Sequence, residues 1–186
     1  MRTFIALPLP DVIINDAFKV REQLETRTTK IKWVEKENYH ITVKFLGDTK
    51  TKFIDNLYIN LANITKDVST INLKTNKIGF FPNERQPRVI WLGVNGELNK
   101  LNKLASKIDY FLSGKDYKEE RQRNFHITLG RIRDGADYEI LRKQVALLNN
   151  KIVARDFIIE RVDFLESQLT SGGPIYKTHK SFYFAS

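Results

Sequence analysis

The chain has no cysteine among its 186 residues, and it has only three histidines. The absence of cysteine excludes disulfide bonds, thiolate metal sites and cysteine nucleophiles. It is also compatible with a reducing compartment, and we expect a cytoplasmic protein. Chemistry that depends on an imidazole is therefore restricted to His40, His126 and His179.

Long apolar runs and flexible linkers are missing as well. The apolar N-terminal stretch is interrupted by Pro8, Pro10 and Asp11, so it is too short and too broken for a signal peptide or a spanning helix. No stretch rich in Gly, Ser or Pro divides the chain. We therefore expect a soluble protein without a membrane partner, in which residues 1–186 form a single domain, and we expect it to be a monomer.

Acidic residues are in deficit. The 31 Lys and Arg residues exceed the 22 Asp and Glu residues, which leaves a formal net charge of +9. A basic surface attracts polyanions and speeds their encounter with the protein. RNA, DNA, nucleotides and an acidic membrane surface all fit this charge, which does not distinguish between them.

The apolar residues follow two different periods. Runs rich in β-branched and aromatic residues predict strands at 2–9, 40–47, 70–81, 88–94, 125–132, 156–169 and 175–184. Helical spacing predicts helices at 11–26, 51–65, 97–114 and 137–150. The order of these elements divides into two similar halves, each with one strand that carries the phrase His-Ile-Thr. The sequence therefore predicts an α+β fold of two similar lobes.

The phrase His-Ile-Thr takes up two of the three histidines, at residues 40–42 and 126–128. Side chains on a strand point alternately to its two faces. In the first copy the polar face is expected to carry His40, Thr42 and Lys44, and the core face to carry Ile41, Val43 and Phe45. In the second copy His126 and Thr128 are expected on the polar face, opposite Ile127 and Leu129.

Two such strands lying side by side would bring two imidazoles and two hydroxyls together. This set suits attack at a phosphodiester, because one neutral His accepts a proton while one protonated His donates a proton to the leaving oxygen. Histidine suits both roles, since its unperturbed pKa is about 6.5. The threonine hydroxyls can donate hydrogen bonds to phosphate oxygens. The pattern therefore favours a shared catalytic site.

These residues resemble the 2H phosphoesterase superfamily, and specifically its RNA 2′,3′-cyclic phosphodiesterase branch, also called the LigT-like or 2′-5′ RNA ligase family. The hallmark of that family is a pair of H-x-T-x motifs, matched here by "HITV" from His40 and "HITL" from His126. The stretches "RTFIALPLP", "KWVEKENYHITVKFLGD", "GFFPNERQPRVIWLGV" and "SGGPIYKTH" are also similar to the family. One departure is Phe125, because the family commonly has a proline before the second histidine.

The resemblance implies a bilobal α+β fold, with antiparallel sheet in two pseudo-symmetric lobes, helices outside and the two motifs facing a central cleft. It implies hydrolysis of a 2′,3′-cyclic phosphate on RNA ends or nucleotides to a 2′-phosphate. It also implies that neither a metal nor a nucleotide cofactor takes part. Members of the family were noticed for joining RNA ends through a 2′-5′ linkage, so a 2′-5′ RNA ligase is an alternative main role.

The resemblance also implies roles for individual residues. His40 and His126 would be the catalytic acid–base pair, with His40 as the acid for O3′ and His126 as the base for water, although these two roles can be exchanged. Thr42, Thr128 and Arg131 would bind the phosphate.

Three further positions depend on how the motif strands are built. Strict alternation puts Arg131 on the face opposite His126, but Gly130 would permit a bulge that turns it back. Lys44 is expected beside His40, either at the phosphate or in solvent. Among the aromatics near the motifs, Phe45 is expected in the core, while Phe4 and Tyr39 are left open between base stacking and core packing.

Two other classes of function remain open at the level of the sequence. In a non-catalytic RNA-binding module the basic charge and the aromatics would matter, and the histidines would only pack. In a metallohydrolase His40 and His126 would bind a metal together with a carboxylate such as Asp48, but the short ligand spacings common in metal sites are absent. His179 has no threonine two positions later and is expected at the surface.

Overall fold

The structure is a computed structural model, and it describes residues 1–25, 30–113, 117, 123–171 and 173–185. Within these residues the elements are β1 (Arg2–Pro8), α1 (Asp11–Leu24), β2 (Ile31–Trp33), the 3-10 helix η1 (Lys36–Asn38), β3 (His40–Asp48), α2 (Thr51–Thr65), β4 (Ile71–Phe81), β5 (Val89–Gly96), α3 (Leu98–Leu112), β6 (His126–Ile132), α4 (Tyr138–Asn149), β7 (Asp156–Ile159), β8 (Arg161–Thr170) and β9 (Gly173–Tyr183).

The described strands form one curled sheet in the order β7-β4-β5-β6-β3-β1-β8-β9, with β2 added alongside β6. Neighbouring strands of this sheet run antiparallel. The centre of the order lies between β6 and β3, so four strands stand on each side of it. The predicted α+β fold with two related lobes of antiparallel sheet is confirmed.

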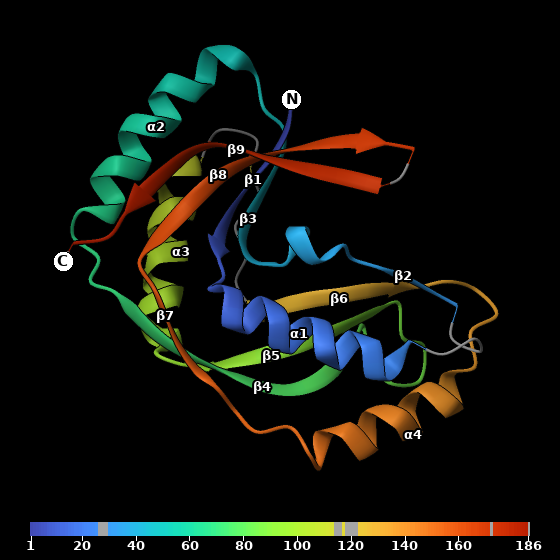
Figure 1. The fold of residues 1–186 in the computed structure, drawn as a ribbon. Helices are drawn as coiled ribbons and strands as arrows, with labels where there is room; N and C mark the ends of the chain where they lie inside the picture. The colour runs from blue at the N-terminus through green and yellow to red at the C-terminus, as the bar shows by residue number, and fades with distance from the viewer. Residues whose placement is uncertain (26–29, 114–116, 118–122, 172, 186) are drawn as a thin grey trace.

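The four helices cover the outside of the two lobes (Figure 1). Helices α2 and α3 contact each other, and α2 also packs on β9 in the lobe of β3, β1, β8 and β9. Helix α1 contacts α4 and β6, and α4 packs on β4 in the other lobe. Among the described residues no helix is long and apolar enough to cross a membrane.

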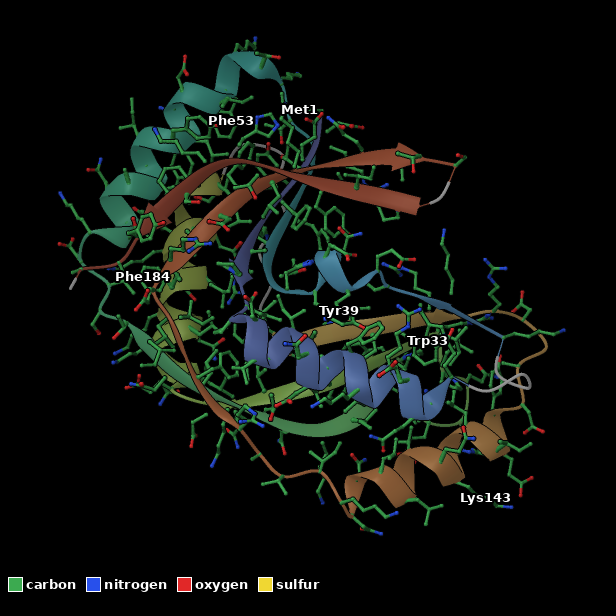
Figure 2. The ribbon with its side chains drawn as sticks, viewed as in Figure 1. Met1, Trp33, Tyr39, Phe53, Lys143 and Phe184 are labelled. Atoms are coloured by element: carbon green, nitrogen blue, oxygen red, sulfur yellow. The ribbon has the colours of Figure 1, made fainter. Side chains whose placement is uncertain are left out.

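The core forms where the apolar faces of the strands meet the apolar stripes of the helices. Ile41 on β3 and Ile127 on β6 are fully buried at the junction of the two lobes. Figure 2 shows Trp33 and Tyr39 close to α1, where the Arg21 guanidinium lies 5.8 Å from the Trp33 ring. Tyr39, left open by the sequence, is therefore a core residue with 4% of its surface exposed.

Three details of the predicted elements differ from the structure. The run 156–169, predicted as one strand, is two strands, because β7 pairs with β4 in one lobe and β8 pairs with β1 in the other. Strand β2 was missed, since three residues are too few for a periodic signal. The helix predicted at 97–114 ends at Leu112, and Gly114 lies outside the described residues.

Candidate active site

The two His-Ile-Thr phrases lie side by side at the centre of the sheet. Strand β3 pairs antiparallel with β6 through Ile41 and Ile127. In an antiparallel pair the residues on either side of a matched pair also face each other. This register places Thr128 across from His40 and His126 across from Thr42. The structure thus brings the four predicted motif residues together on one face, with the two imidazoles on one diagonal and the two hydroxyls on the other.

Both motif strands contain an irregularity directly after the threonine. Where β1 and β3 pair, Val43 is an extra residue of β3, and where β5 and β6 pair, Leu129 is an extra residue of β6. A bulge of this kind reverses the alternation of faces beyond it. The order of buried and accessible residues is accordingly the same in both strands, and the fifth residue after each histidine is exposed.

The bulge in β6 turns Arg131 to the same side as the motif. Arg131 lines a cleft together with His40, Thr42 and Thr128, as the prediction based on Gly130 required. Glycine is needed there for a second reason, since a Cβ on Gly130 would lie 2.6 Å from the Ile31 side chain on β2. Close packing of β2 against this point is therefore possible only without a side chain.

The bulge in β3 contradicts two predictions. Phe45, expected in the core, is 64% exposed and lines the cleft. Lys44, expected beside His40, is only 3% exposed on the opposite face. Its Nζ lies 2.7 Å from Oδ1 of Asp109 on α3, and Asp109 also pairs with Arg123. The sequence pattern missed this exchange because strict alternation assumes a strand without a bulge.

The two imidazoles are held in the same way. Nδ1 of His40 donates a hydrogen bond to the Asn38 carbonyl at 2.7 Å, and Nδ1 of His126 donates to the Asn124 carbonyl at 2.6 Å. Since a carbonyl oxygen only accepts, Nδ1 carries the proton in both neutral rings, and the lone pair is on Nε2. Nε2 of His40 lies 2.9 Å from the Thr42 hydroxyl.

Aromatic rings flank each imidazole. The Phe4 and Tyr176 rings lie 5.0 and 5.3 Å from His40 between ring centroids. The Phe81 and Trp91 rings lie 4.9 and 5.9 Å from His126. Each imidazole thus has two aromatic neighbours that limit its room to rotate.

Burial makes both histidines weaker bases than in water. Burial lowers the pKa of His40 from its ordinary value, the hydrogen bond to the Asn38 carbonyl opposes this, and His126 nearby lowers the pKa further. Burial also lowers the pKa of His126, against the hydrogen bond to the Asn124 carbonyl. His126 lies diagonally across from His40, although it is not itself among the residues that line the cleft.

The cleft has a volume of about 510 Å³, which is within the usual range for a small-molecule site. It also contains residues that the sequence analysis did not select, from the start of β1, the segment around β2 and the β8–β9 hairpin. They include Arg2, Trp33 and Tyr176. None belongs to a motif with a chemical signature. All three lie in stretches that resemble the family, "RTFIALPLP", "KWVEKENYHITVKFLGD" and "SGGPIYKTH", but the resemblance gave none of them a role.

Phe4 and His179 complete the predicted candidates. Phe4 lines the cleft, yet it is only 3% exposed and forms part of the core beneath His40. His179 is an exposed residue of β9, as expected, with Nε2 2.9 Å from the Glu166 carboxylate.

The arrangement does not favour the metallohydrolase alternative. In the described part of the chain no three His, Asp or Glu side chains are grouped as a metal site would require. Asp48, the carboxylate considered for that role, lines a separate hollow with Lys50 and Lys52 rather than the cleft of His40.

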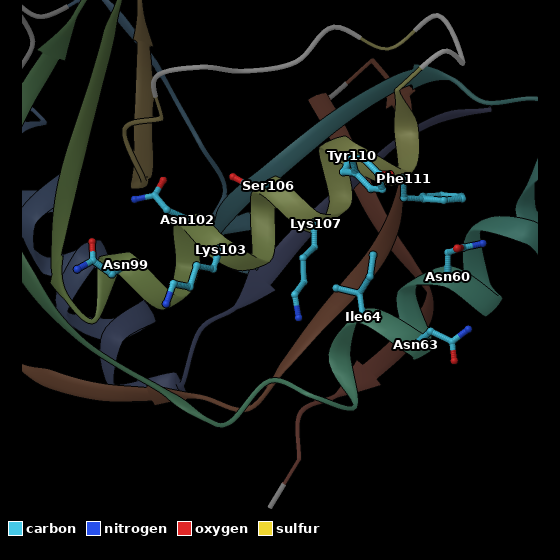
Figure 3. Close-up of a pocket in the computed structure, with 10 residues that line it drawn as sticks. All are labelled: Asn60, Asn63, Ile64, Asn99, Asn102, Lys103, Ser106, Lys107, Tyr110 and Phe111. Atoms are coloured by element: carbon cyan, nitrogen blue, oxygen red, sulfur yellow. The ribbon is translucent and has the colours of Figure 1, made fainter.

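A second hollow lies between α2 and α3 on the outside of the molecule (Figure 3). Its lining consists mainly of asparagine, lysine and aromatic side chains, including Lys103, Lys107 and Tyr110. Its described lining contains no histidine and no carboxylate, the side chains that serve most often as general acid and base. The cleft at β3 and β6 is therefore the candidate active site.

Comparison with known families supports the internal repeat. The sequence model of the family described as LigT like Phosphoesterase matches this chain twice, at residues 7–91 and 92–176. His40 and His126 stand at nearly the same distance from the start of each match. Each half of the chain thus contributes one motif strand, as the order of the elements predicted.

The chain is also similar to individual proteins over nearly its whole length. It is 33% identical to the RNA 2′,3′-cyclic phosphodiesterase of Methanocaldococcus jannaschii, over 98% of this chain and 100% of that protein. It is 30% identical to the protein of the same name from Aquifex aeolicus, over 98% of this chain and 97% of the relative. The crystal structure of a Thermus thermophilus protein, TT0787, has the same fold, with a TM-score of 0.80 at 20% identity, over 99% of this chain and 98% of that chain.

Proposed function

The chain belongs to the LigT like phosphoesterase family, and on that premise we propose that it hydrolyses a terminal 2′,3′-cyclic phosphate on RNA to a 2′-phosphate. Two relatives that match it from end to end are named RNA 2′,3′-cyclic phosphodiesterase. The net charge of +9 suits a polyanionic substrate.

The observation that carries the proposal is the matched tautomer of the two histidines. Each Nδ1 donates to a backbone carbonyl two residues earlier, so Nε2 is the nitrogen that can transfer a proton in each ring, and in His40 it lies beside the Thr42 hydroxyl. One ring that is neutral at Nε2 and one that is protonated there form the acid–base pair that phosphodiester hydrolysis needs. A structural histidine in the core has no need of this matched arrangement.

The proposed reaction begins with a water molecule beside the cyclic phosphate. Nε2 of His126 takes a proton from the water molecule while the water oxygen attacks phosphorus. The bond from phosphorus to O3′ breaks, and Nε2 of His40 gives its proton to O3′. The phosphate stays on O2′, and both histidines have exchanged their protonation states. Ligation through a 2′-5′ linkage would use the same groups in exchanged roles.

Three side chains are proposed to bind the phosphate. The Thr42 and Thr128 hydroxyls stand on the other diagonal, flanking the imidazoles, where they can donate to the non-bridging oxygens. Arg131 adds a permanent positive charge to the same cleft. Together with the protonated histidine these groups balance the charge that develops on the phosphate, so we propose that the reaction proceeds without a metal.

The test is hydrolysis of an RNA oligonucleotide that ends in a 2′,3′-cyclic phosphate, with excess chelator. We expect a 2′-phosphate product, and losses of roughly 10²-fold or more for His40→Ala and for His126→Ala. His179→Ala is the matched control, because this exposed histidine pairs with Glu166 away from the cleft, and it is expected to retain activity.

The same experiment separates the alternatives. A protein that binds the oligonucleotide without cleaving it would be an RNA-binding module. Activity that disappears with the chelator would contradict the metal-free mechanism. Full activity in either His40→Ala or His126→Ala would show that the imidazoles are not the acid–base pair.

A further inference from the structure

The two halves of the active site match at the histidine and the threonine but differ at the next accessible position. The bulges bring the fifth residue after each histidine to the cleft side, which is Arg131 in one half and Phe45 in the other. The pseudo-symmetric pair is therefore a cation and an aromatic ring. The reaction uses the cation at the phosphate, but it assigns no role to Phe45.

Phe45 offers an aromatic face that the buried rings of the cleft do not. Its side chain is 64% exposed, whereas Phe4 and Trp33 are buried at 3% and 9%. The Phe4 ring supports Phe45 from below, with 6.1 Å between the ring centroids. Leaving so large an apolar ring in water is unfavourable. A nucleic acid base stacked on that ring would cover it, and any of the four bases can stack in this way.

A second cation stands at the same end of the cleft. Arg2 is an exposed residue of β1 that lines the cleft together with Phe45. Arg131 and Tyr176 line the same cleft. Burial raises the pKa of the Tyr176 hydroxyl, and the positive charges of Arg131 and Arg2 oppose this. Asp48 is the backbone partner of Arg2 across the strands, yet within the described residues Arg2 forms no ion pair with a carboxylate.

A mononucleoside 2′,3′-cyclic phosphate has one phosphate, and the histidines, threonines and Arg131 already account for it. A second anion reaches Arg2 only when the RNA continues beyond its terminal nucleotide. We propose that Phe45 and Arg2 form a subsite for the penultimate nucleotide, with its base stacked on Phe45 and the adjoining phosphodiester bound by Arg2. This inference rests on the proposed function and adds a preference for RNA chains over mononucleotides.

The test compares two substrates, adenosine 2′,3′-cyclic phosphate and the dinucleotide ApA that ends in a 2′,3′-cyclic phosphate. The readout is the ratio of kcat/KM for the dinucleotide to kcat/KM for the mononucleotide. Phe45→Ala is expected to lower this ratio roughly 5- to 150-fold, the range that loss of one stacked base corresponds to. Arg2→Gln is expected to lower it as well, and Phe45→Trp is expected to preserve it.

Tyr110→Ala is the matched control, because this 83% exposed aromatic lies in the hollow between α2 and α3. The ratio of the two kcat/KM values in Tyr110→Ala is expected to equal the ratio in the wild type. Equal losses on both substrates in Phe45→Ala would overturn the proposal, because Phe45 would then serve the terminal nucleotide. An unchanged ratio would overturn it too.

A binding measurement separates this inference from the proposed activity. The dinucleotide ApA with a 3′-phosphate end has no cyclic bond to hydrolyse, and its affinity can be compared with that of adenosine 3′-phosphate. Suppose that the wild type cleaves neither substrate, and that Phe45→Ala weakens binding of the dinucleotide more than binding of the mononucleotide. The subsite then stands and the proposed function fails. If the wild type cleaves both substrates and the variants change neither binding nor the ratio, the proposed function stands and the subsite fails.

Discussion

The chemistry proposed for this protein depends on the positions of two imidazoles and on which of their ring nitrogens are hydrogen-bonded to the backbone. In both His40 and His126, Nδ1 is hydrogen-bonded to a backbone carbonyl two residues earlier in the chain, so the local backbone sets the tautomer. Burial then lowers the pKa of both rings. The tautomer leaves Nε2 for proton transfer, and the pKa decides the pH range in which one ring is protonated.

This determines the expected pH dependence of the reaction. Because the pKa of each free histidine lies below its ordinary value of about 6.5, the protonated acid is lost as the pH rises through that lowered range. We expect a bell-shaped profile of kcat/KM with its maximum below about pH 6.5, measured on a cyclic phosphate whose own charge is constant. A profile that stays level from that maximum into the alkaline range would contradict the assignment.

The pH profile of kcat is expected to have its maximum at a higher pH than the profile of kcat/KM. A bound phosphate is negatively charged and favours the protonated imidazole, so it raises the pKa of the acid in the complex. Comparing the two profiles on the same enzyme checks this without any variant.

At the level of elements, one helix connects the two motif strands through buried ion pairs on the face opposite the motif. Asp109 on α3 pairs with Lys44, which follows the motif in β3, and with Arg123, which precedes β6. All three side chains are buried. Buried charges are tolerated when they are paired, and removal of the shared partner takes that compensation away from both cations.

Asp109→Ala is therefore expected to destabilise the fold by about 3–5 kcal/mol, the range for breaking a buried ion pair. Urea unfolding of the wild type and the variant measures the difference. Asp134→Ala is the matched control, since its ion pair with Arg88 is exposed and such pairs contribute little. Equal stability of the two variants would show that the buried cluster does not hold the strands together.

On the scale of the whole molecule, the two halves of the chain are interwoven. Strand β4 comes from the first half and lies beside β5 and β7, while β8 from the second half lies beside β1. Each lobe thus contains strands from both halves. This arrangement supports the prediction that residues 1–186 form a single domain, which domain dissection would test.

The net charge of +9 belongs to the same scale. Long-range attraction of a polyanion weakens as salt screens the charges. We expect kcat/KM for an RNA oligonucleotide to fall more steeply with added salt than kcat/KM for a mononucleoside cyclic phosphate, because the oligonucleotide has more phosphates to attract. Parallel slopes for the two substrates would indicate that the surface charge does not guide the RNA.

Much of the site follows from sequence alone, because its central signal is local. Strand alternation is enough to place His40 with Thr42 and His126 with Thr128, and the repeat of the phrase is enough to pair them. Arg131 could be anticipated because Gly130 marks a possible bulge. No comparable residue marks the bulge in β3, so Phe45 and Lys44 were assigned to the wrong faces.

The sequence by itself predicted the proposed acid–base pair, the residues proposed to bind the phosphate and the two-lobed α+β class. These predictions came from the alternation within short strands, the order of the elements and the resemblance to a family. Only the tertiary structure decided what surrounds them. Whether β3 bulges at Val43 depends on its register against β1, and the contribution of Arg2 and Tyr176 depends on segments at opposite ends of the chain meeting in the sheet. These are non-local pairings, and local sequence patterns do not encode which strand will be the neighbour.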